Sequence, residues 1–175
     1  MKKISLLKIC IQIILISSIA FVSCDEKKNS EADLEIKDGL LYKKGSDTPY
    51  TGRERAKVEN NILEYDVKDG IKHGEFLIYS TEEVLLIKGQ LDSNRNVGKW
   101  QYFYPTGELE YEGHFVDNQP EGQWFWYYRD GKKREEGNYN AGMRVGVWYQ
   151  YDHDGEIVFE KDFDDTSDVS QSNIK

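Results

Sequence analysis

Apolar and polar residues alternate along the middle of the chain in segments of strand length. The segment Gly98-Lys99-Trp100-Gln101-Tyr102-Phe103-Tyr104 places an aromatic ring at every second position, and a related segment begins at Gly122. Side chains at alternate positions share one face of a strand, so this pattern predicts β-strands. No helical period appears between Leu40 and Phe163.

A turn sequence with glycine follows each strand of this kind. Pro105-Thr106-Gly107-Glu108 is one example, and glycine supplies the positive φ that a tight hairpin needs. A second alternating segment, such as residues 108–115, then forms the returning strand. Each unit is therefore predicted to be one β-hairpin. The first unit carries Glu83 where the others have glycine, so its turn is expected to differ.

The units repeat every 24 residues, and several columns keep that spacing independently. A bulky aromatic residue follows two positions after each glycine of the first series, as Trp100 follows Gly98. In a further column, Asn94 and Asn118 stand where other units have glycine. Asparagine is the residue that best replaces glycine at positive φ, so this column predicts a left-handed turn position. The three glycine series are Gly74, Gly98, Gly122 and Gly146; Gly89, Gly113 and Gly137; and Gly107, Gly131 and Gly155.

The predicted fold class is all-β, an elongated antiparallel sheet of tandem hairpins of about 24 residues. A lone hairpin is marginal in water, but stacked hairpins share aromatic rows and stabilise one another. The tryptophans and tyrosines would bury ~150 to 250 Å² each, which supplies a core where aliphatic residues are few.

The two ends of the chain are predicted to lie outside the repeats. Three lysines precede an apolar stretch that ends at Ser23-Cys24, which indicates a lipoprotein signal peptide over residues 1–23 and lipidation of Cys24. Residues 24–37 are charged and predict a flexible tether. The repeat domain is expected over 38–163, and 164–175 is expected to be a disordered acidic tail.

The charge balance argues against several partners. Loss of residues 1–23 lowers Lys plus Arg from 23 to 20 against 32 Asp plus Glu, so the formal charge moves from −9 to −12. Such a surface repels phosphate backbones and anionic lipid headgroups, so nucleic acid is not an expected partner and only lipidated Cys24 should touch the membrane. Cys24 would be the single cysteine left, which excludes an internal disulfide.

The repeat units resemble a known family. Lys72-His73-Gly74-Glu75-Phe76 and Val97-Gly98-Lys99-Trp100 are similar to the MORN repeat in its bacterial variant. The opening residues Gly39-Leu40-Leu41-Tyr42-Lys43 resemble the start of YwqK-type bacterial proteins. This resemblance implies that the protein is a scaffold, that it offers a protein-binding surface or, from the family's naming, that it acts as an antitoxin.

No pattern typical of a catalytic site is found. The three histidines, His73, His114 and His153, fall in different columns of the repeat, so no metal site or cofactor is predicted. The repeat region has few serines, all in predicted loops or turns, and no nucleophile elbow. The glycines feed no helix, so no phosphate-binding loop is expected. We expect a protein that is not an enzyme.

The leading hypothesis is a lipoprotein of the bacterial cell envelope, periplasmic or surface-exposed, that binds a protein partner through its sheet. An antitoxin or immunity protein that neutralises a basic toxin is the first alternative, and a glycan-binding module is the second. Open sheet edges would also allow self-association. The candidate binding residues are Trp126, Tyr102, Trp100, Trp124 and Trp148. Burial is the expected role of the last three, which hold the fixed column, and Trp126 with Tyr102 is expected at the surface.

Overall fold

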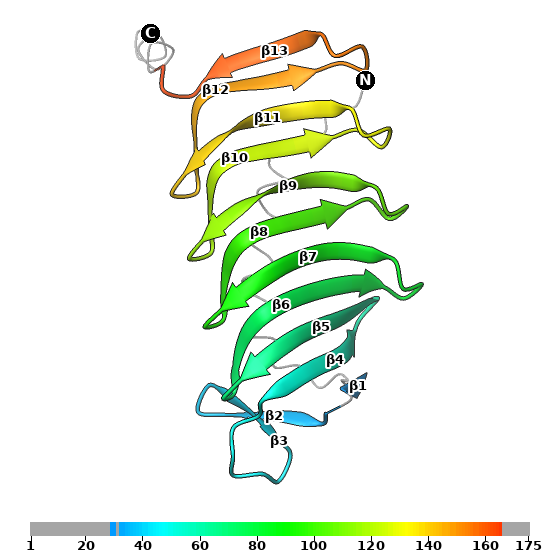
Figure 1. The fold of residues 1–175 in the computed structure, drawn as a ribbon, viewed down its shortest axis with the longest axis vertical. Helices are drawn as coiled ribbons and strands as arrows, with labels where there is room; N and C mark the ends of the chain where they lie inside the picture. Colours follow the sequence, from blue (N-terminus) through cyan, green and yellow to red (C-terminus); the bar gives the residue numbers. More distant parts are fainter. Residues whose placement is uncertain (1–28, 31, 166–175) are drawn as a thin grey trace, which may run out of the picture.

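The computed structural model describes residues 29–30 and 32–165, which form β-structure without a helix. Eleven strands make one antiparallel sheet in the order β1-β4-β5-β6-β7-β8-β9-β10-β11-β12-β13, and β2 pairs with β3 separately (Figure 1). The strands are β1 Asn29–Ser30, β2 Leu34–Lys37, β3 Leu40–Lys43, β4 Gly52–Val58, β5 Asn61–Lys68, β6 Ile71–Ser80, β7 Leu85–Asp92, β8 Arg95–Phe103, β9 Leu109–Val116, β10 Gln119–Tyr127, β11 Lys133–Asn140, β12 Met143–Tyr151 and β13 Ile157–Asp162.

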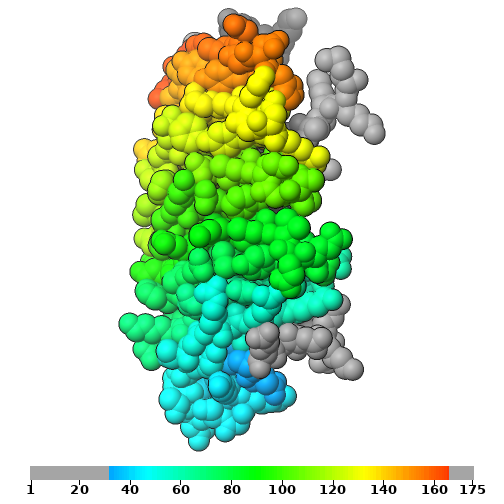
Figure 2. Space-filling view, turned by 45° about the vertical axis from the view of Figure 1, so that its right-hand side comes forward, coloured from blue at the N-terminus to red at the C-terminus, as the bar shows by residue number. Residues whose placement is uncertain are grey.

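From β4 onward, every strand pairs with its neighbour in sequence, so the sheet is a ladder of consecutive hairpins. The strands curve as they cross the sheet, and the hairpins stack along the long axis of the molecule as successive bands (Figures 1 and 2). The predicted elongated antiparallel sheet of tandem hairpins is confirmed.

Two-residue turns join β5 to β6, β7 to β8, β9 to β10 and β11 to β12. Asn94 and Asn118 have φ of 63° and 68°, and the residue before each is also left-handed. Two successive positive φ values are typical of a type I′ hairpin turn. The prediction of a left-handed column is therefore confirmed. The turns also bond to one another, since the N–H of Asn94 donates to the carbonyl of Lys72 at 3.0 Å.

The first glycine series lies inside strands and not in the turns between them. Strand β10 already begins at Gln119, directly after the turn, and Gly122 sits within it at φ 68°. The pairing register between β9 and β10 shifts between Glu121 and Phe125. Gly122 is therefore at a β-bulge, where two extra residues of β10 bend the strand. Gly74, Gly98 and Gly146 also have positive φ within their strands.

The second glycine series makes room for tryptophan. A Cβ placed on Gly113 would lie 2.1 Å from the indole of Trp124, and one on Gly89 would lie 2.2 Å from Trp100. Neither glycine has positive φ. The same relation joins Gly137 to Trp148. These glycines are therefore required by packing, because each indole lies against the bare backbone of the preceding strand.

The turn at Glu83 is the same as the glycine turns, so the prediction that it differs is wrong. Glu83 adopts φ 62°, and its N–H donates to the carbonyl of Ser80 at 3.1 Å. The corresponding bond from Gly107 to Tyr104 is 2.8 Å, and Gly107 has φ 99°. The Arg55 guanidinium bonds both carboxylate oxygens of Glu83 at 2.6 Å. The stacked neighbours impose the left-handed backbone on a residue that disfavours it.

One face of the curved sheet holds an aromatic core. Trp100, Trp124 and Trp148 are fully buried, as expected for the fixed column. Trp126 is 1% exposed and Tyr102 5%, so the prediction that this pair lies at the surface is wrong. Both lie two residues beyond a column tryptophan, on the same face of the strand. Other core rings pack edge-on to the indoles, such as Phe115 against Trp124 and Tyr139 against Trp148.

The N-terminal boundary of the folded region also needs correction. Leu34–Lys37 is a strand that pairs with Leu40–Lys43, although residues 24–37 were expected to be a tether. A backbone hydrogen bond ties this hairpin to the turn between β5 and β6, since the N–H of Leu41 donates to the carbonyl of Gly70 at 2.9 Å. Strand β1 pairs with Lys57 and Ala56 of β4. Cys24, the predicted signal peptide and residues 166–175 of the predicted tail lie outside the described residues.

Candidate functional site

The face opposite the core carries a row of acidic and aromatic side chains. Odd-numbered positions of β10 and β12 point away from the buried tryptophans because side chains alternate along a strand. Phe125 pairs with Glu112 on one side and Glu136 on the other, and Tyr149 pairs with Glu136 and Glu160. We call this series the acid–aromatic row: Glu112, Phe125, Glu136, Tyr149 and Glu160.

A second line of rings runs beside this row. Tyr127 stacks with Phe125 and Tyr151 packs beside Tyr149, with ring centroids 6.5 Å apart in both pairs. All four rings are half-buried, so each packs its base on the sheet and leaves part of its surface to solvent. Rings of intermediate exposure therefore cover this face over β10 and β12.

Arginines cover the same face at the N-terminal end of the sheet. Arg53 bonds Glu64, Asp66 and Glu75 at 2.9–3.2 Å. Arg55 pairs with Glu64 and stacks 5.9 Å from the centre of the Tyr79 ring. The described part of the face around the acid–aromatic row holds lysines instead of arginines at its carboxylates. The half-buried ring of Phe103 shares a repeat column with Tyr127 and Tyr151, but both rings of the acid–aromatic row, Phe125 and Tyr149, lie in the C-terminal half.

One lysine sits at the centre of this surface. Lys133 Nζ lies 2.9 Å from Glu136 Oε2. It also lies 5.2 Å from the centre of the Phe125 ring and 5.8 Å from that of Tyr151. Lys133 thus places its ammonium group between two rings and a carboxylate, a geometry in which aromatic faces attract cations.

Glu136 and Tyr151 form a short hydrogen bond, in which the phenol donates to Glu136 Oε1 at 2.5 Å. This bond and then burial raise the pKa of Tyr151 to about 12. Burial alone would raise the pKa of Glu136, but hydrogen bonds from Tyr151 and Lys133 outweigh it and lower that pKa. Glu136 is thus held as the charged carboxylate.

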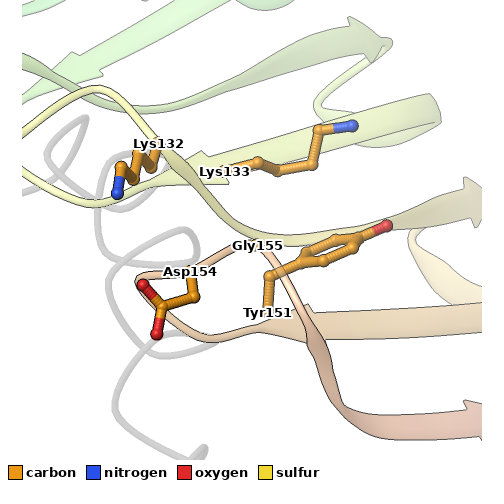
Figure 3. Close-up of a pocket in the computed structure, with 5 residues that line it drawn as sticks. All are labelled: Lys132, Lys133, Tyr151, Asp154 and Gly155. Atoms are coloured by element: carbon orange, nitrogen blue, oxygen red, sulfur yellow. The ribbon is translucent and has the colours of Figure 1, made fainter.

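A shallow pocket of about 390 Å³ opens between the turns that follow β10 and β12 (Figure 3). Lys132, Lys133, Tyr151, Asp154 and Gly155 line it. The Lys133 chain runs alongside the Tyr151 ring, whereas Lys132 points to the other side (Figure 3). Two lysines and one aspartate line the pocket, so its formal charge is net positive. It extends the aromatic surface without forming an enclosed site.

The three histidines lie apart from one another in the described part of the chain. His73 lies beside Asp92 and His153 beside Asp130, in separate hairpins, and His114 is exposed elsewhere. No group of three or more potential metal ligands gathers among residues 29–30 and 32–165. Within that same part of the chain, no helix is long and apolar enough to cross a membrane.

The structure separates the predicted binding residues from the exposed aromatic surface. Trp100, Tyr102, Trp124, Trp126 and Trp148 all lie in the core. The half-buried rings are their odd-numbered neighbours. Strand alternation contained the missing signal, since a ring next to a buried tryptophan must face the other way.

Comparison with known proteins places two of the hairpins in a family. Residues 96–117 and 120–141 match the family model described as MORN repeat variant. Each matched MORN segment begins two residues after a type I′ asparagine, so one repeat runs from one such turn to the next. MORN repeats generally serve as modules that interact with proteins or membranes.

Other comparisons are less informative. A search of curated proteins found no match. One solved structure, described as the crystal structure of GtfA/B complex bound to UDP and GlcNAc, is similar over 87% of this chain and 36% of that chain. The identity is 13% and the TM-score 0.25. The chain thus spans about a third of the solved chain's length, and so weak a likeness indicates nothing about function.

Proposed function

We propose that this chain is a non-enzymatic scaffold that binds a basic segment of a protein partner along the acid–aromatic row. The observation that carries the proposal is the alternation of carboxylates with half-buried rings across β9 to β13. Lysine and arginine side chains stack on aromatic rings and pair with carboxylates. Lys133 already occupies one such position from within the chain.

The dimensions of the row suit a protein ligand. Strands lie ~4.8 Å apart, so the row from β9 to β13 spans about 19 Å. Tyrosine and phenylalanine are enriched at interfaces because they contribute large area with few rotatable bonds. The rings are held by a continuous sheet, so little entropy is lost when a partner binds.

The sequence favours a particular cellular location for this scaffold. The lipoprotein signal pattern before Cys24 favours a bacterial envelope protein anchored through that cysteine. Incorporation of radiolabelled palmitate should occur in the full chain and vanish in Cys24→Ala. Incorporation that persists in the variant would contradict the anchor.

An antitoxin or immunity role is the first alternative within this function. The YwqK resemblance suggests it, and a basic toxin would complement the formal charge of −12 that follows loss of residues 1–23. A glycan-binding module is the second alternative, favoured by the packed pair Tyr149 and Tyr151, because rings can stack on sugar faces. The identity of the captured molecule decides among these roles.

Site-specific photo-crosslinking in cells tests the proposal. A photoreactive amino acid at Phe125 should capture one dominant polypeptide. The same group at Thr106, exposed in the turn between β8 and β9, should not capture it. A basic secreted toxin among the products would favour the immunity role. Equal capture from both positions would contradict a binding surface at the row.

A double variant provides the matched control. Phe125→Ser with Tyr149→Ser should abolish capture from a probe at Tyr127, because both rings of the row are lost. Val116→Ser removes an apolar residue that is 57% exposed on another part of the sheet and should leave capture unchanged. Loss of capture in both variants, or in neither, would overturn the proposal.

A further inference from the structure

The last strand of the sheet is exposed along its whole length. Every residue of β13 is exposed, whereas the equivalent strands β9 and β11 each contain buried residues. Ile157, Val158 and Phe159 expose 53%, 61% and 47% of their surface, and Phe163 just beyond exposes 36%. Large apolar side chains therefore concentrate at this end of the array.

The outer edge of β13 also presents backbone donors. Within the part of the chain that the structure describes, β12 is the only neighbour of β13. The N–H of Phe163 donates to the carbonyl of Gly146 on β12 at 2.9 Å. Successive N–H groups of a strand point in opposite directions, so the N–H of Asp162 points to the open edge. An extended segment could pair with this edge.

The array cannot simply continue with another strand of its own type. In the earlier repeats, the position equivalent to Lys161 is glycine, and the tryptophan of the next strand covers it. At Gly137, even a Cβ would lie 2.1 Å from the Trp148 indole. Lys161 occupies that space and lies 5.2 Å from the Phe163 ring. A Gly-x-Trp strand from a second copy therefore cannot dock in the register of the repeat.

The negative charge at this end of the sheet further limits which kind of segment can pair with β13. Residues 152–165 contain seven Asp or Glu residues and a single Lys, which gives a formal charge of −6. Antiparallel pairing of two β13 strands around their acidic residues would oppose like charges, which destabilises a sheet. A basic strand would instead find carboxylates on the solvent face and the Phe159 and Phe163 rings on the core face.

We propose that β13 binds an extended segment of another protein, with alternating apolar and basic residues, as an added strand of the sheet. The apolar side chains cover Phe159 and Phe163. The basic side chains pair with Glu160 and Asp162. This edge site shares Glu160 with the acid–aromatic row but does not include the rings Phe125 and Tyr149.

Binding of synthetic peptides to the full chain in detergent tests this proposal. A fluorescent peptide of about eight alternating valine and lysine residues, long enough to span one strand, should bind. Its valine and glutamate counterpart should not. Raising the salt concentration to ~1 M, where the Debye length is about 3 Å, should weaken the binding of the lysine peptide. Equal binding of both peptides, or of neither, would overturn the proposal.

Variants of Asp162 locate the site. Asp162→Pro removes the N–H at the open edge and should reduce affinity by about tenfold or more, the equivalent of one to two backbone hydrogen bonds. Proline is tolerated where a strand's N–H faces solvent, so melting should change little. Asp162→Asn keeps the N–H and should lose less affinity. Glu160→Lys with Asp162→Lys should shift preference toward the acidic peptide, which keeps the test valid if the proline variant misfolds.

Two controls distinguish the β13 edge from the acid–aromatic row and from self-pairing of the chain. In a chain that already carries Phe125→Ser with Tyr149→Ser, Asp162→Pro should still reduce affinity for the lysine peptide by about tenfold or more. A proline without effect in that background would place the peptide on the row and contradict the edge site. Analytical ultracentrifugation without peptide should give the same oligomeric state for the unaltered chain and for Asp162→Pro. A dimer that this variant abolishes would replace the proposal with self-pairing.

Discussion

The N–H of Gly142 donates to the carbonyl of Pro120 at 3.0 Å, the bond that Asn118 makes with Asn96 one repeat earlier. At Asn118 a second bond runs back, because its Oδ1 accepts from the N–H of Asn96 at 2.7 Å. Proline has no N–H to donate, and the residue that faces Pro120 is glycine. The choice between asparagine and glycine in this column thus follows the backbone donor of the preceding turn.

Removal of the Asn118 amide should weaken the stack of turns. Asn118→Gly keeps the left-handed backbone but leaves the Asn96 N–H without its partner, so we expect a loss of about 1 kcal/mol in unfolding free energy. Chemical denaturation followed by fluorescence measures it. Gly142→Asn is the matched control and should gain no stability, because Pro120 offers no donor. A gain in that control would contradict this account.

A methyl group on Gly113 should disrupt the core. Its Cβ would lie 2.1 Å from the Trp124 ring, so Gly113→Ala should cost about 1–3 kcal/mol through overpacking. Near-ultraviolet circular dichroism should change as the indole shifts. Gly107→Ala has no atom within 4 Å of its Cβ and should show backbone strain alone, with an unchanged near-ultraviolet spectrum. Identical spectra in the two variants would argue against the packing role.

Glycine at position 83 should stabilise the protein. Relief of left-handed strain is worth ~1–2 kcal/mol, partly offset by the greater freedom of glycine in the unfolded chain, so Glu83→Gly should gain about 0.5–1 kcal/mol. The lost ion pair with Arg55 is exposed and contributes little. Glu83→Ala removes the same carboxylate but keeps the Cβ, so its melting temperature should stay close to that of the unaltered chain. A gain in both variants would implicate the carboxylate instead.

Titration of Tyr151 should reveal its bond to Glu136. The folded pKa of Tyr151 is raised from 10.0 to about 12, so its contribution to stability is present below the unfolded pKa and is lost as the pH rises through about 12. Nuclear magnetic resonance of ring-labelled tyrosine can follow this single residue. In Glu136→Gln its pKa should fall toward the ordinary value. An unchanged pKa would show that the hydrogen bond is not the main cause.

Most of the fold was predictable from local features, namely turn positions with positive φ and the alternation of side chains along strands. Asn94 and Asn118 indicated left-handed turns because few residues tolerate that conformation. The alternation around Trp100 and Trp124 indicated strands, and the common period of 24 residues joined them into an array. Glu83 misled the prediction because a residue's preference is small beside the pairing of the hairpins on either side.

The exposed surface was less predictable. Trp126 was expected to be exposed because its repeat column also holds glutamine at position 150. The prediction failed because the residue types in a repeat column do not reveal whether each member is buried. In the folded protein the Trp126 ring lies 5.4 Å from Trp148 and 6.2 Å from Tyr111, on neighbouring hairpins. Those contacts join residues more than a dozen positions apart. The half-buried rings Phe125 and Tyr149 share a column with non-aromatic residues, so the repeat pattern did not single them out.

Residue order alone was enough for the type and phase of the repeated hairpins, since turns and strand alternation depend on a few adjacent residues. It did not reveal the additional hairpin of β2 and β3. The assembled sheet decided which rings are buried, where strands bulge and which carboxylates stand beside aromatic rings. The acid–aromatic row exists only because pairing brings Glu112, Phe125 and Glu136 into line from three strands. Register between strands is a long-range property, so this surface emerges only on folding.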